Sequence, residues 1–355
     1  MRFVIFCHSL VSDWNHGNAH FLRGVARELL ARGHDVQVYE PEDAWSRVNL
    51  VRDHGEEPLR AFERAFPELR STRYGRGLDV AEAVRGADLV LVHEWNDPAL
   101  MRSVGETGVP ALFHDTHHRA ATKPEELRRY DLSGYAGVLA FGAVIRDLYL
   151  ERGWARRAWT WHEAADTRLF RPLPREPEAD LVWIGNWGDG ERTRELRELL
   201  IEPARRLGLR GSVHGVRYPD DAVRELRRAG LEYRGWTPNH RVPELFARHR
   251  VTVHVPRRPY VEALPGIPTI RPFEALACGI PLVSAPWADA ERLFRPGDYL
   301  VARDGEEMER RLRTVLEIGF DTAPGLETIR RRHTCAHRVD ELLRIAGELE
   351  PARAA

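Results

Sequence analysis

The sequence has few cysteines and no long apolar run, and both shortages narrow what the chain can be. Its three cysteines, Cys7, Cys278 and Cys335, are odd in number and widely spaced, so they predict neither a disulfide framework nor a thiolate metal cage. The longest apolar runs are far shorter than the roughly 20 residues that cross a bilayer, so we expect no membrane span. Together these features are typical of a cytoplasmic protein.

The chain also has almost no net charge. It carries 53 Lys and Arg residues against 54 Asp and Glu residues, which gives a formal net charge of −1. A balance this close to neutrality provides no broad attraction to a polyanion. We therefore do not expect nucleic acid to be a partner.

What the sequence does contain is an alternation of strand-like and helix-like segments. The 355 residues are 43% hydrophobic and 30% charged, which is typical of a folded globular protein. A β-rich run at 2–8 is followed by apolar residues with helical spacing at 21–30, and by another β-rich run at 36–39. Later segments of the same alternation include a strand predicted at 89–93 and a helix predicted at 191–207. This order predicts βαβ units and a parallel sheet.

The alternation is interrupted once, at a proline-rich segment. Residues 171–178 hold three prolines, a composition that resists both helix and sheet and favours a connector. We therefore predict an N-terminal domain at 1–171, a second domain at 178–325, and a C-terminal helix or helices at 326–355 that return toward the first domain. The predicted fold class is α/β, with two Rossmann-like, doubly wound parallel-sheet domains that face each other across a cleft.

Polar residues gather where the predicted strands end. Ligands of open parallel sheets bind beyond the carboxyl ends of the strands. The segments there are His8–Ser9, His93–Asn96, His114–His118, Gly185–Gly188, His214–Gly215 and Pro256–Arg258. We expect these groups to line a single cleft.

The strongest local pattern runs from Gly266 to Val283. A loop of Gly, Pro and Thr leads into a predicted helix at 271–278, which carries Glu274 in its first turn. Backbone N–H groups at a helix start favour a phosphate, and a nearby carboxylate can accept hydrogen bonds from ribose hydroxyls. An ordinary helix with an acidic first turn has the same spacing, so this pattern alone leaves both interpretations open.

Several segments resemble the GT-B glycosyltransferase superfamily. Residues 273–283 resemble its "EA-ACG-PVV" signature, and the form Thr-x-Arg-x-Phe-Glu at 269–274 looks most like the CgeB-like (spore maturation protein) group. The resemblance also extends to the glycosyltransferase family 1- and 4-like group. Further similar segments lie in the expected order along the chain, at 13–17, 31–36, 166–172, 182–186 and 233–236.

This resemblance implies a donor site for a nucleoside-diphosphate sugar, held mainly by the second domain. Glu274 would accept hydrogen bonds from the ribose hydroxyls. The backbone amides around Thr269 and Ile270 would hold the diphosphate, with Arg271 beside them. Arg192 would bind the phosphates, because a forked guanidinium suits that task.

Four further positions complete the donor site that the resemblance implies. The backbone of Gly17 would approach the same phosphates, because no Cβ stands in the way. Gly235 and Trp236 match the segment that lies against the base, and Asn186 ends a matched segment of the second domain. Apart from the resemblance, Trp187 and Trp236 are the two tryptophans that could face a ligand, and burial in a core is the alternative for each.

One position departs from the family pattern. Relatives with two glutamates carry a second acid where this chain has Gly266. Recognition of the sugar hydroxyls must therefore come from elsewhere, with Glu262 and Tyr260 as candidates.

The catalytic candidates depend on the stereochemistry of transfer. A retaining front-face route needs no protein nucleophile, whereas an inverting route needs a base, for which the candidates are Asp13, His16, His114 and Asp115. Arg192 would stabilise the leaving diphosphate in either case. The histidines of 114–118 would need a helix to form a metal site, and the preceding residues favour a strand end, so we predict no metal.

The resemblance therefore implies a metal-independent, retaining glycosyltransferase of hexosyltransferase type, while the residues themselves leave the inverting route open. It would use no bound cofactor, and its co-substrate would be a nucleotide sugar, with UDP- or GDP-sugars first. The acceptor would be a small molecule, a glycan or a protein. Two alternatives remain open: a sugar-nucleotide epimerase of GT-B architecture, and a non-catalytic sugar-nucleotide binder.

Overall fold

A computed structural model of the chain describes residues 1–349. It divides the chain into two compact units, one formed by residues 1–163 with the described residues from Cys335 onward, and one formed by Ala164–Thr334. The division falls after Glu163, whereas the sequence places the junction at 171–178; those prolines lie in extended chain that leads into the second sheet. Of the predicted C-terminal segment 326–355, residues 350–355 lie outside the described residues.

The first unit is built on a parallel sheet of seven strands in the order β3-β2-β1-β4-β5-β6-β7. Strands β1, β4 and β5 lie in its centre and are apolar almost throughout, as expected for strands buried on both faces. The strands are β1 (Arg2–Phe6), β2 (Asp35–Pro41), β3 (Ser71–Tyr74), β4 (Leu89–His93), β5 (Ala111–Asp115), β6 (Gly137–Ala140) and β7 (Ala158–Thr160).

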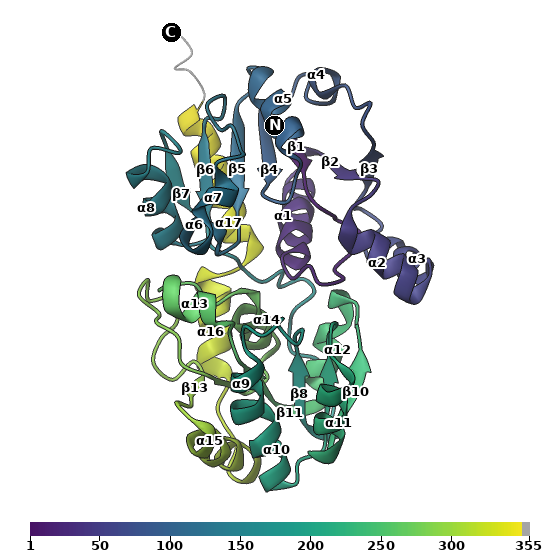
Figure 1. Cartoon of the computed structure of the whole chain (residues 1–355), viewed down its shortest axis with the longest axis vertical. Coiled ribbons are helices and arrows are strands. Elements are labelled where there is room, and N and C mark those ends of the chain that lie inside the picture. The colour runs from purple at the N-terminus through teal and green to yellow at the C-terminus, as the bar shows by residue number, and fades with distance from the viewer. Residues whose placement is uncertain (350–355) are drawn as a thin grey trace. The chain divides into compact units, whose positions relative to one another are not determined.

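Helices cover this sheet, and the last described helix of the chain is among them (Figure 1). Helix α17 packs against α1 through an ion pair of 2.5 Å between Arg32 and Asp340, and the Trp161 indole donates a hydrogen bond of 2.9 Å to the Arg338 carbonyl. The helices are α1 (Ala19–Ala31), α2 (Trp45–His54), α3 (Glu57–Ala65), α4 (Val80–Ala83), α5 (Pro98–Glu106), α6 (Arg119–Thr122), α7 (Pro124–Leu127), α8 (Ala143–Glu151) and α17 (Cys335–Leu349).

The second unit has its own parallel sheet of six strands, in the order β10-β9-β8-β11-β12-β13. Its core holds apolar residues from both faces of the sheet, with Trp183 and Trp187 among them. Trp187 is therefore a core residue, and it is not one of the side chains that face a ligand. The strands are β8 (Ala179–Ile184), β9 (Gly211–His214), β10 (Leu231–Gly235), β11 (His249–His254), β12 (Leu282–Ser284) and β13 (Leu300–Val301).

The helices of the second unit follow the same alternation. The helix predicted at 191–207 spans 193–207 and contains one π-turn, η1. The full set is α9 (Thr193–Leu196), η1 (Arg197–Ile201), α10 (Glu202–Leu207), α11 (Asp220–Arg228), the 3-10 turn η2 (Asn239–Arg241), α12 (Val242–Ala247), α13 (Arg258–Ala263), α14 (Ile270–Cys278), α15 (Gly305–Glu317) and α16 (Ala323–Arg332). Within residues 1–349, none of the helices combines the length and apolar character needed to cross a bilayer.

Because all strands of each sheet run parallel, each unit has one edge where every strand presents its carboxyl end. This edge is the ligand-binding edge of open α/β sheets. The candidate residues are therefore described unit by unit, starting from these strand ends.

Candidate functional site

The second unit holds an arginine side chain at the carboxyl end of β8. Arg192 donates hydrogen bonds of 2.9 Å to the Val255 carbonyl and 2.6 Å to the Asn186 carbonyl. Its guanidinium carbon lies 5.1 Å from the centroid of the Trp183 ring. Among the described residues, no carboxylate lies within ion-pair distance of Arg192, and its Nε is buried without a hydrogen-bond partner.

Two glycines make room for this side chain. Gly188 has φ +95°, and a Cβ there would lie 2.8 Å from Cγ of Arg192; a Cβ on Gly185 would lie 3.2 Å from its Nη2. Any larger residue at Gly188 would therefore contact the Arg192 side chain at too short a distance, and the arginine would have to move. Gly188 is therefore the glycine that the position of Arg192 most directly requires, whereas a Cβ on Gly185 would meet the Trp183 ring first.

Other cations surround Arg192. Burial, and then the nearby charge of Arg257, lowers the pKa of Arg192 to about 10, and Arg271 adds to the effect. Arg257 pairs with Glu191 at 3.0 Å and Arg271 pairs with Glu274, whereas Arg192 has only carbonyl partners. A half-buried cation whose Nε is buried, with cationic neighbours, favours an anion that can pair with it.

Sequence reasoning missed His254, which ends β11 in the same region. The ring accepts or donates a hydrogen bond of 2.9 Å between Nδ1 and the Ser284 hydroxyl. Burial, and then the charges of Arg192 and Arg271, lowers its pKa to about 3. His254 is the last residue of the observed strand, and this place at a strand end is the signal that could have found it.

Helix α14 begins one residue earlier than predicted. Its first residue is Ile270, so Glu274 lies in the second turn and not in the first turn as expected. Thr269 precedes the helix with φ +66° and ψ 178°, and no side chain caps the helix start. The free N–H groups of Ile270 and Arg271 are therefore the natural anion-binding groups here.

Glu274 is fully buried and held from two sides. The Asn239 side-chain amide donates a hydrogen bond of 2.8 Å to Oε1, and Arg271 pairs with Oε2. Each carboxylate oxygen can accept more than one hydrogen bond, so the group retains acceptor capacity. Asn239 belongs to η2 and was not predicted.

The ends of β8, β9 and β10 lie side by side. The Gly215 N–H donates a hydrogen bond of 2.8 Å to the Gly235 carbonyl, and the Val216 N–H donates one of 2.9 Å to Oδ1 of Asn186. A Cβ on Gly215 would lie only 2.1 Å from the Gly185 carbonyl oxygen. Trp236 follows Gly235 and is half-buried, so the backbone here is close-packed up to the position that the resemblance assigns to the base.

In the first unit, four histidines form a row at the same kind of edge. This imidazole row is His8, His16, His93 and His114, with successive ring centroids 5.5, 5.8 and 5.5 Å apart. All four are buried, and burial lowers their pKa values, to about 4 for His8 and about 3 for His114. The row is therefore uncharged at neutral pH.

Three ring nitrogens of the row have no hydrogen-bond partner among residues 1–349: Nε2 of His16, Nδ1 of His93 and Nε2 of His114. The Thr116 hydroxyl donates to Glu94 at 2.8 Å and lies 3.2 Å from Nε2 of His93. Nε2 of His93 must therefore carry the hydrogen, which leaves Nδ1 as a free acceptor. Buried acceptors of this kind suit a hydroxyl donor.

A carboxyl pair lies behind the row. Glu94 and Asp115 are almost fully buried, and burial, followed by Asp115, raises the pKa of Glu94 to about 8. Burial also raises the pKa of Asp115, whose oxygens accept hydrogen bonds from the Tyr149 hydroxyl at 2.7 Å and the His117 N–H at 3.0 Å. Glu94, which pairs with Arg119 at 2.8 Å, lies in the predicted strand-end segment His93–Asn96, but the sequence assigned it no role of its own.

The other first-unit candidates lie in the loop between β1 and α1. Gly17 is exposed. Asp13 forms a nearly buried ion pair of 2.7 Å with Arg23, which holds its carboxylate to that partner. Within the described part of the chain, no three His, Cys, Asp or Glu side chains are placed to hold a metal ion.

The structure thus brings the predicted residues together in two groups, one in each unit. In the second unit, Arg192 contacts Asn186, and Arg271 is close enough to lower its pKa. Thr269 and Ile270 start the helix of Arg271, which pairs with Glu274, and Gly235 and Trp236 lie at the end of β10. In the first unit lie His16, His114 and Asp115, with Gly17 in the following loop.

Comparisons with known proteins agree with this architecture. Residues 192–344 match a family model described as glycosyl transferase-like, while no curated protein matches the chain significantly. The structure resembles HepE of Anabaena in complex with UDP and glucose, with 14% identity and a TM-score of 0.67 over 98% of this chain and 100% of that chain. The fold is GT-B.

Two further GT-B structures show the same likeness. An alpha-glucosyltransferase in complex with UDP and a DNA 13-mer shares 11% identity at a TM-score of 0.68, over 98% of this chain and 99% of that chain. Sucrose-phosphate synthase from Thermosynechococcus elongatus shares 12% identity at a TM-score of 0.64, over 98% and 99%. These comparisons do not single out the CgeB-like group of GT-B proteins.

Proposed function

We propose that this chain is a glycosyltransferase that moves a sugar from a nucleoside-diphosphate sugar, with a UDP-sugar first, to an acceptor hydroxyl. The observation that carries the proposal is Arg192, a guanidinium with cationic neighbours and no carboxylate partner among residues 1–349. It lies at the sheet edge where ligands of α/β proteins bind. A diphosphate would supply the negative charge that pairs with the Arg192 guanidinium.

The remaining second-unit residues fit the rest of such a donor. The N–H groups of Ile270 and Arg271 would hold phosphate oxygens. Glu274, oriented by Asn239, would accept the ribose hydroxyls, and Gly235 and Trp236 would border the base. Preorganised donors at the diphosphate would stabilise the charge that develops on the leaving group, and two of the similar structures are described as complexes with UDP.

The first unit would serve the acceptor. Uncharged imidazoles with free acceptor nitrogens suit a hydroxylated small molecule, a glycan or a protein side chain, and not a strongly charged group. We propose transfer with retention at the anomeric carbon, without a metal or a bound cofactor, in the cytoplasm. The CgeB-like group remains our proposed subgroup.

The donor site can be tested by nucleotide binding. Arg192→Ala should weaken UDP binding by about 10- to 100-fold in isothermal titration, because a charged hydrogen-bonding group contributes about 1.5–3 kcal/mol. The matched control is Arg194→Ala, whose side chain is 81% exposed and which should bind like the parent protein. Equal binding by Arg192→Ala and the parent protein would remove the donor assignment.

The reaction can be tested with the bound donor. Incubating the protein with each of UDP-, GDP-, ADP- and TDP-sugars and an acceptor mixture, followed by NMR, should reveal a new glycoside with the donor's anomeric configuration. Appearance of an epimeric nucleotide sugar without acceptor would instead identify an epimerase. Binding without transfer or hydrolysis would identify a non-catalytic binder, and loss of activity with a chelator would contradict metal independence.

A further inference from the structure

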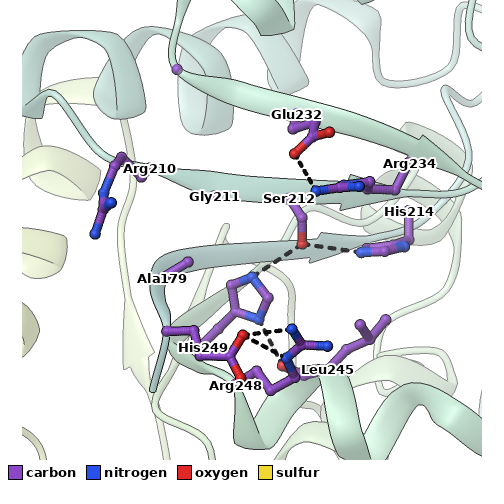
Figure 2. Close-up of a pocket in the computed structure, with 12 residues that line it drawn as sticks. Ala179, Arg210, Gly211, Ser212, His214, Glu232, Arg234, Leu245, Arg248 and His249 are labelled. Carbon is purple, nitrogen blue, oxygen red and sulfur yellow. Dashed lines mark hydrogen bonds and ion pairs between the residues drawn. The ribbon is translucent and has the colours of Figure 1, made fainter. Parts of the chain in front are cut away.

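The C-terminal unit holds a cavity whose lining does not include Arg192. It measures about 580 Å³ and is lined by residues from the start of β8, the outer face of β9 and β10, the end of α12 and the start of β11. Figure 2 shows that Ser212 lies between His214 and His249 on its wall, joined to both by hydrogen bonds. The donor site described above uses none of these side chains.

These side chains belong to a longer series of hydrogen bonds, here called the His214 row. The Thr237 hydroxyl lies 2.8 Å from Nδ1 of His214, and Ser212 Oγ lies 3.0 Å from Nε2 of His214. The same Oγ lies 3.1 Å from Nε2 of His249, whose Nδ1 lies 2.7 Å from the Leu245 carbonyl oxygen.

The Leu245 carbonyl fixes the direction of every bond in the row. A carbonyl can only accept, so Nδ1 of His249 carries a hydrogen and Nε2 of the neutral ring accepts from Ser212. Ser212 must then accept from Nε2 of His214, which leaves Nδ1 of His214 to accept from Thr237. With both rings neutral, each member of the row therefore has one defined partner on each side.

The surroundings keep both rings neutral. Burial, then His249 and Arg234, lowers the pKa of His214 to about 4. Burial lowers the pKa of His249, and the charge of Arg248 lowers it further. The hydrogen bond to the Leu245 carbonyl and the carboxylates of Glu178 and Asp180 raise it, but they do not outweigh burial. The row is consequently intact at neutral pH.

The row ends in the segment that borders the proposed nucleoside. Thr237 follows Gly235 and Trp236, and two residues later Asn239 donates its hydrogen bond to Glu274. At the other side of the segment, the Gly235 carbonyl accepts from the Gly215 N–H at 2.8 Å. His214 thus fixes the Thr237 hydroxyl in the middle of the loop 235–239. One end of this loop would border the base, and the other end contacts Glu274, the proposed acceptor of the ribose hydroxyls.

We propose that His214 is a positioning residue for the nucleoside half of the donor, acting through Thr237 on the loop 235–239. This inference rests on the proposed function. It predicts that the row affects recognition of the base and ribose, while the diphosphate, held by Arg192 and the start of α14, is indifferent to it.

The test compares two ligands that share the diphosphate. His214→Leu should raise the dissociation constant of UDP about tenfold, the effect of losing one hydrogen bond of about average strength, while that of inorganic pyrophosphate stays within twofold. Thr237→Val, which is nearly isosteric, should do the same. The double variant should be no worse than either single one, because both remove one interaction. Arg210→Ala, which lines the cavity outside the row, should bind both ligands like the parent protein.

The outcomes separate this inference from the proposal beneath it. An unchanged UDP affinity in Thr237→Val, or equal weakening of UDP and pyrophosphate in both variants, overturns the positioning role while leaving the donor site standing. A parent protein that binds pyrophosphate but no nucleotide overturns both. Should His214→Leu fail to fold, Thr237→Val alone decides, because it removes only the hydroxyl.

Discussion

Arg192 lies across the ring of Trp183, with its guanidinium carbon 5.1 Å from the ring centroid. The indole N–H is itself held by the Tyr218 hydroxyl at 2.7 Å, so the surface under the arginine is fixed. This arrangement, together with the two glycines beside it, places a cation at the end of β8 without a carboxylate to neutralise it among residues 1–349. The affinity for a nucleoside diphosphate should therefore depend on the position of this guanidinium.

Replacing Gly188 by Ala should displace Arg192. The new Cβ would lie 2.8 Å from Cγ of the arginine, and we expect UDP affinity to fall about tenfold as the guanidinium leaves its two carbonyl partners. The matched control is Gly190→Ala. Gly190 also has positive φ, +84°, but a Cβ there meets nothing within 4 Å.

Both glycine variants should lose about 1 kcal/mol of stability in urea unfolding, because alanine is strained at positive φ. Only Gly188→Ala should lose nucleotide binding as well. If Gly190→Ala weakened UDP to the same extent, backbone strain and not contact with Arg192 would explain the effect.

Glu274→Gln tests the ribose assignment. The substitution keeps the shape of the side chain but removes the charge that Arg271 and the ribose hydroxyls would share. We expect the parent protein to bind UDP about tenfold more tightly than 2′-deoxy-UDP, and Glu274→Gln to bind the two with similar affinity. Glu244→Gln, on the exposed side of α12 and paired with Arg241 at 3.3 Å, is the control that should keep the discrimination.

Persistence of the discrimination in Glu274→Gln would exclude this carboxylate as the group that recognises the ribose. Equal affinity for UDP and 2′-deoxy-UDP in the parent protein would have the same consequence.

The fold could be predicted from the sequence where burial is uniform. The strand at 89–93 was predicted with its observed bounds, because both of its faces are buried and its apolar run is continuous. Strand β3 was missed because it lies at the sheet edge with a half-polar, partly exposed sequence. Helix α2 was not predicted either, since only two of its residues are buried and its apolar pattern is weak.

Residues of the candidate site could be predicted from the sequence only where they follow a predicted strand or match a motif of the family resemblance. His114 and Arg192 were found in this way. Asn239 was not, because its role depends on a contact with Glu274 across 35 residues. The positive φ of Thr269 likewise has no signal in its residue type, and Pro272, which is tolerated in a first helical turn, concealed the earlier start of α14.

Acidification should destabilise the protein through the imidazole row. The folded-state pKa values of His8 and His114 are about 4 and about 3, whereas an unfolded histidine titrates near 6.5. Below about pH 6.5 the unfolded chain therefore binds more protons than the folded one, and the free energy of unfolding falls as pH drops. Each such histidine contributes up to about 1.4 kcal/mol per pH unit.

Urea unfolding at pH 7, 6 and 5 measures this slope, and His114→Phe should reduce it by about one proton. Phe21→Leu serves as the control for lost packing, since Phe21 contacts His114 with ring centroids 5.8 Å apart but does not titrate. It should lower stability at every pH and leave the slope unchanged. An identical slope in His114→Phe and the parent protein would show that this ring titrates in the folded state as it does in the unfolded chain.

Glu94 should make the free energy of unfolding fall as pH rises, which is the opposite of the effect of the histidines. Its pKa in the folded state is raised to about 8, by burial first and Asp115 second, whereas an unfolded glutamate titrates near about 4.3. Between these two values the folded protein holds a proton that the unfolded chain has released. The free energy of unfolding therefore falls as pH rises through this range, and the fall ends near pH 8.

The interval from about pH 7.5 to 8 isolates this effect, because an ordinary histidine, which titrates near about 6.5, is then largely neutral in both states. Glu94→Gln should flatten the stability profile there, since an amide does not titrate. Thr116→Val should extend the fall to higher pH, because the Thr116 hydroxyl donates to the Glu94 carboxylate at 2.8 Å and its bond lowers the pKa. A flat profile in the parent protein would show that the pair shares no proton, and Asp115 would then be available as an ionised base for an inverting route.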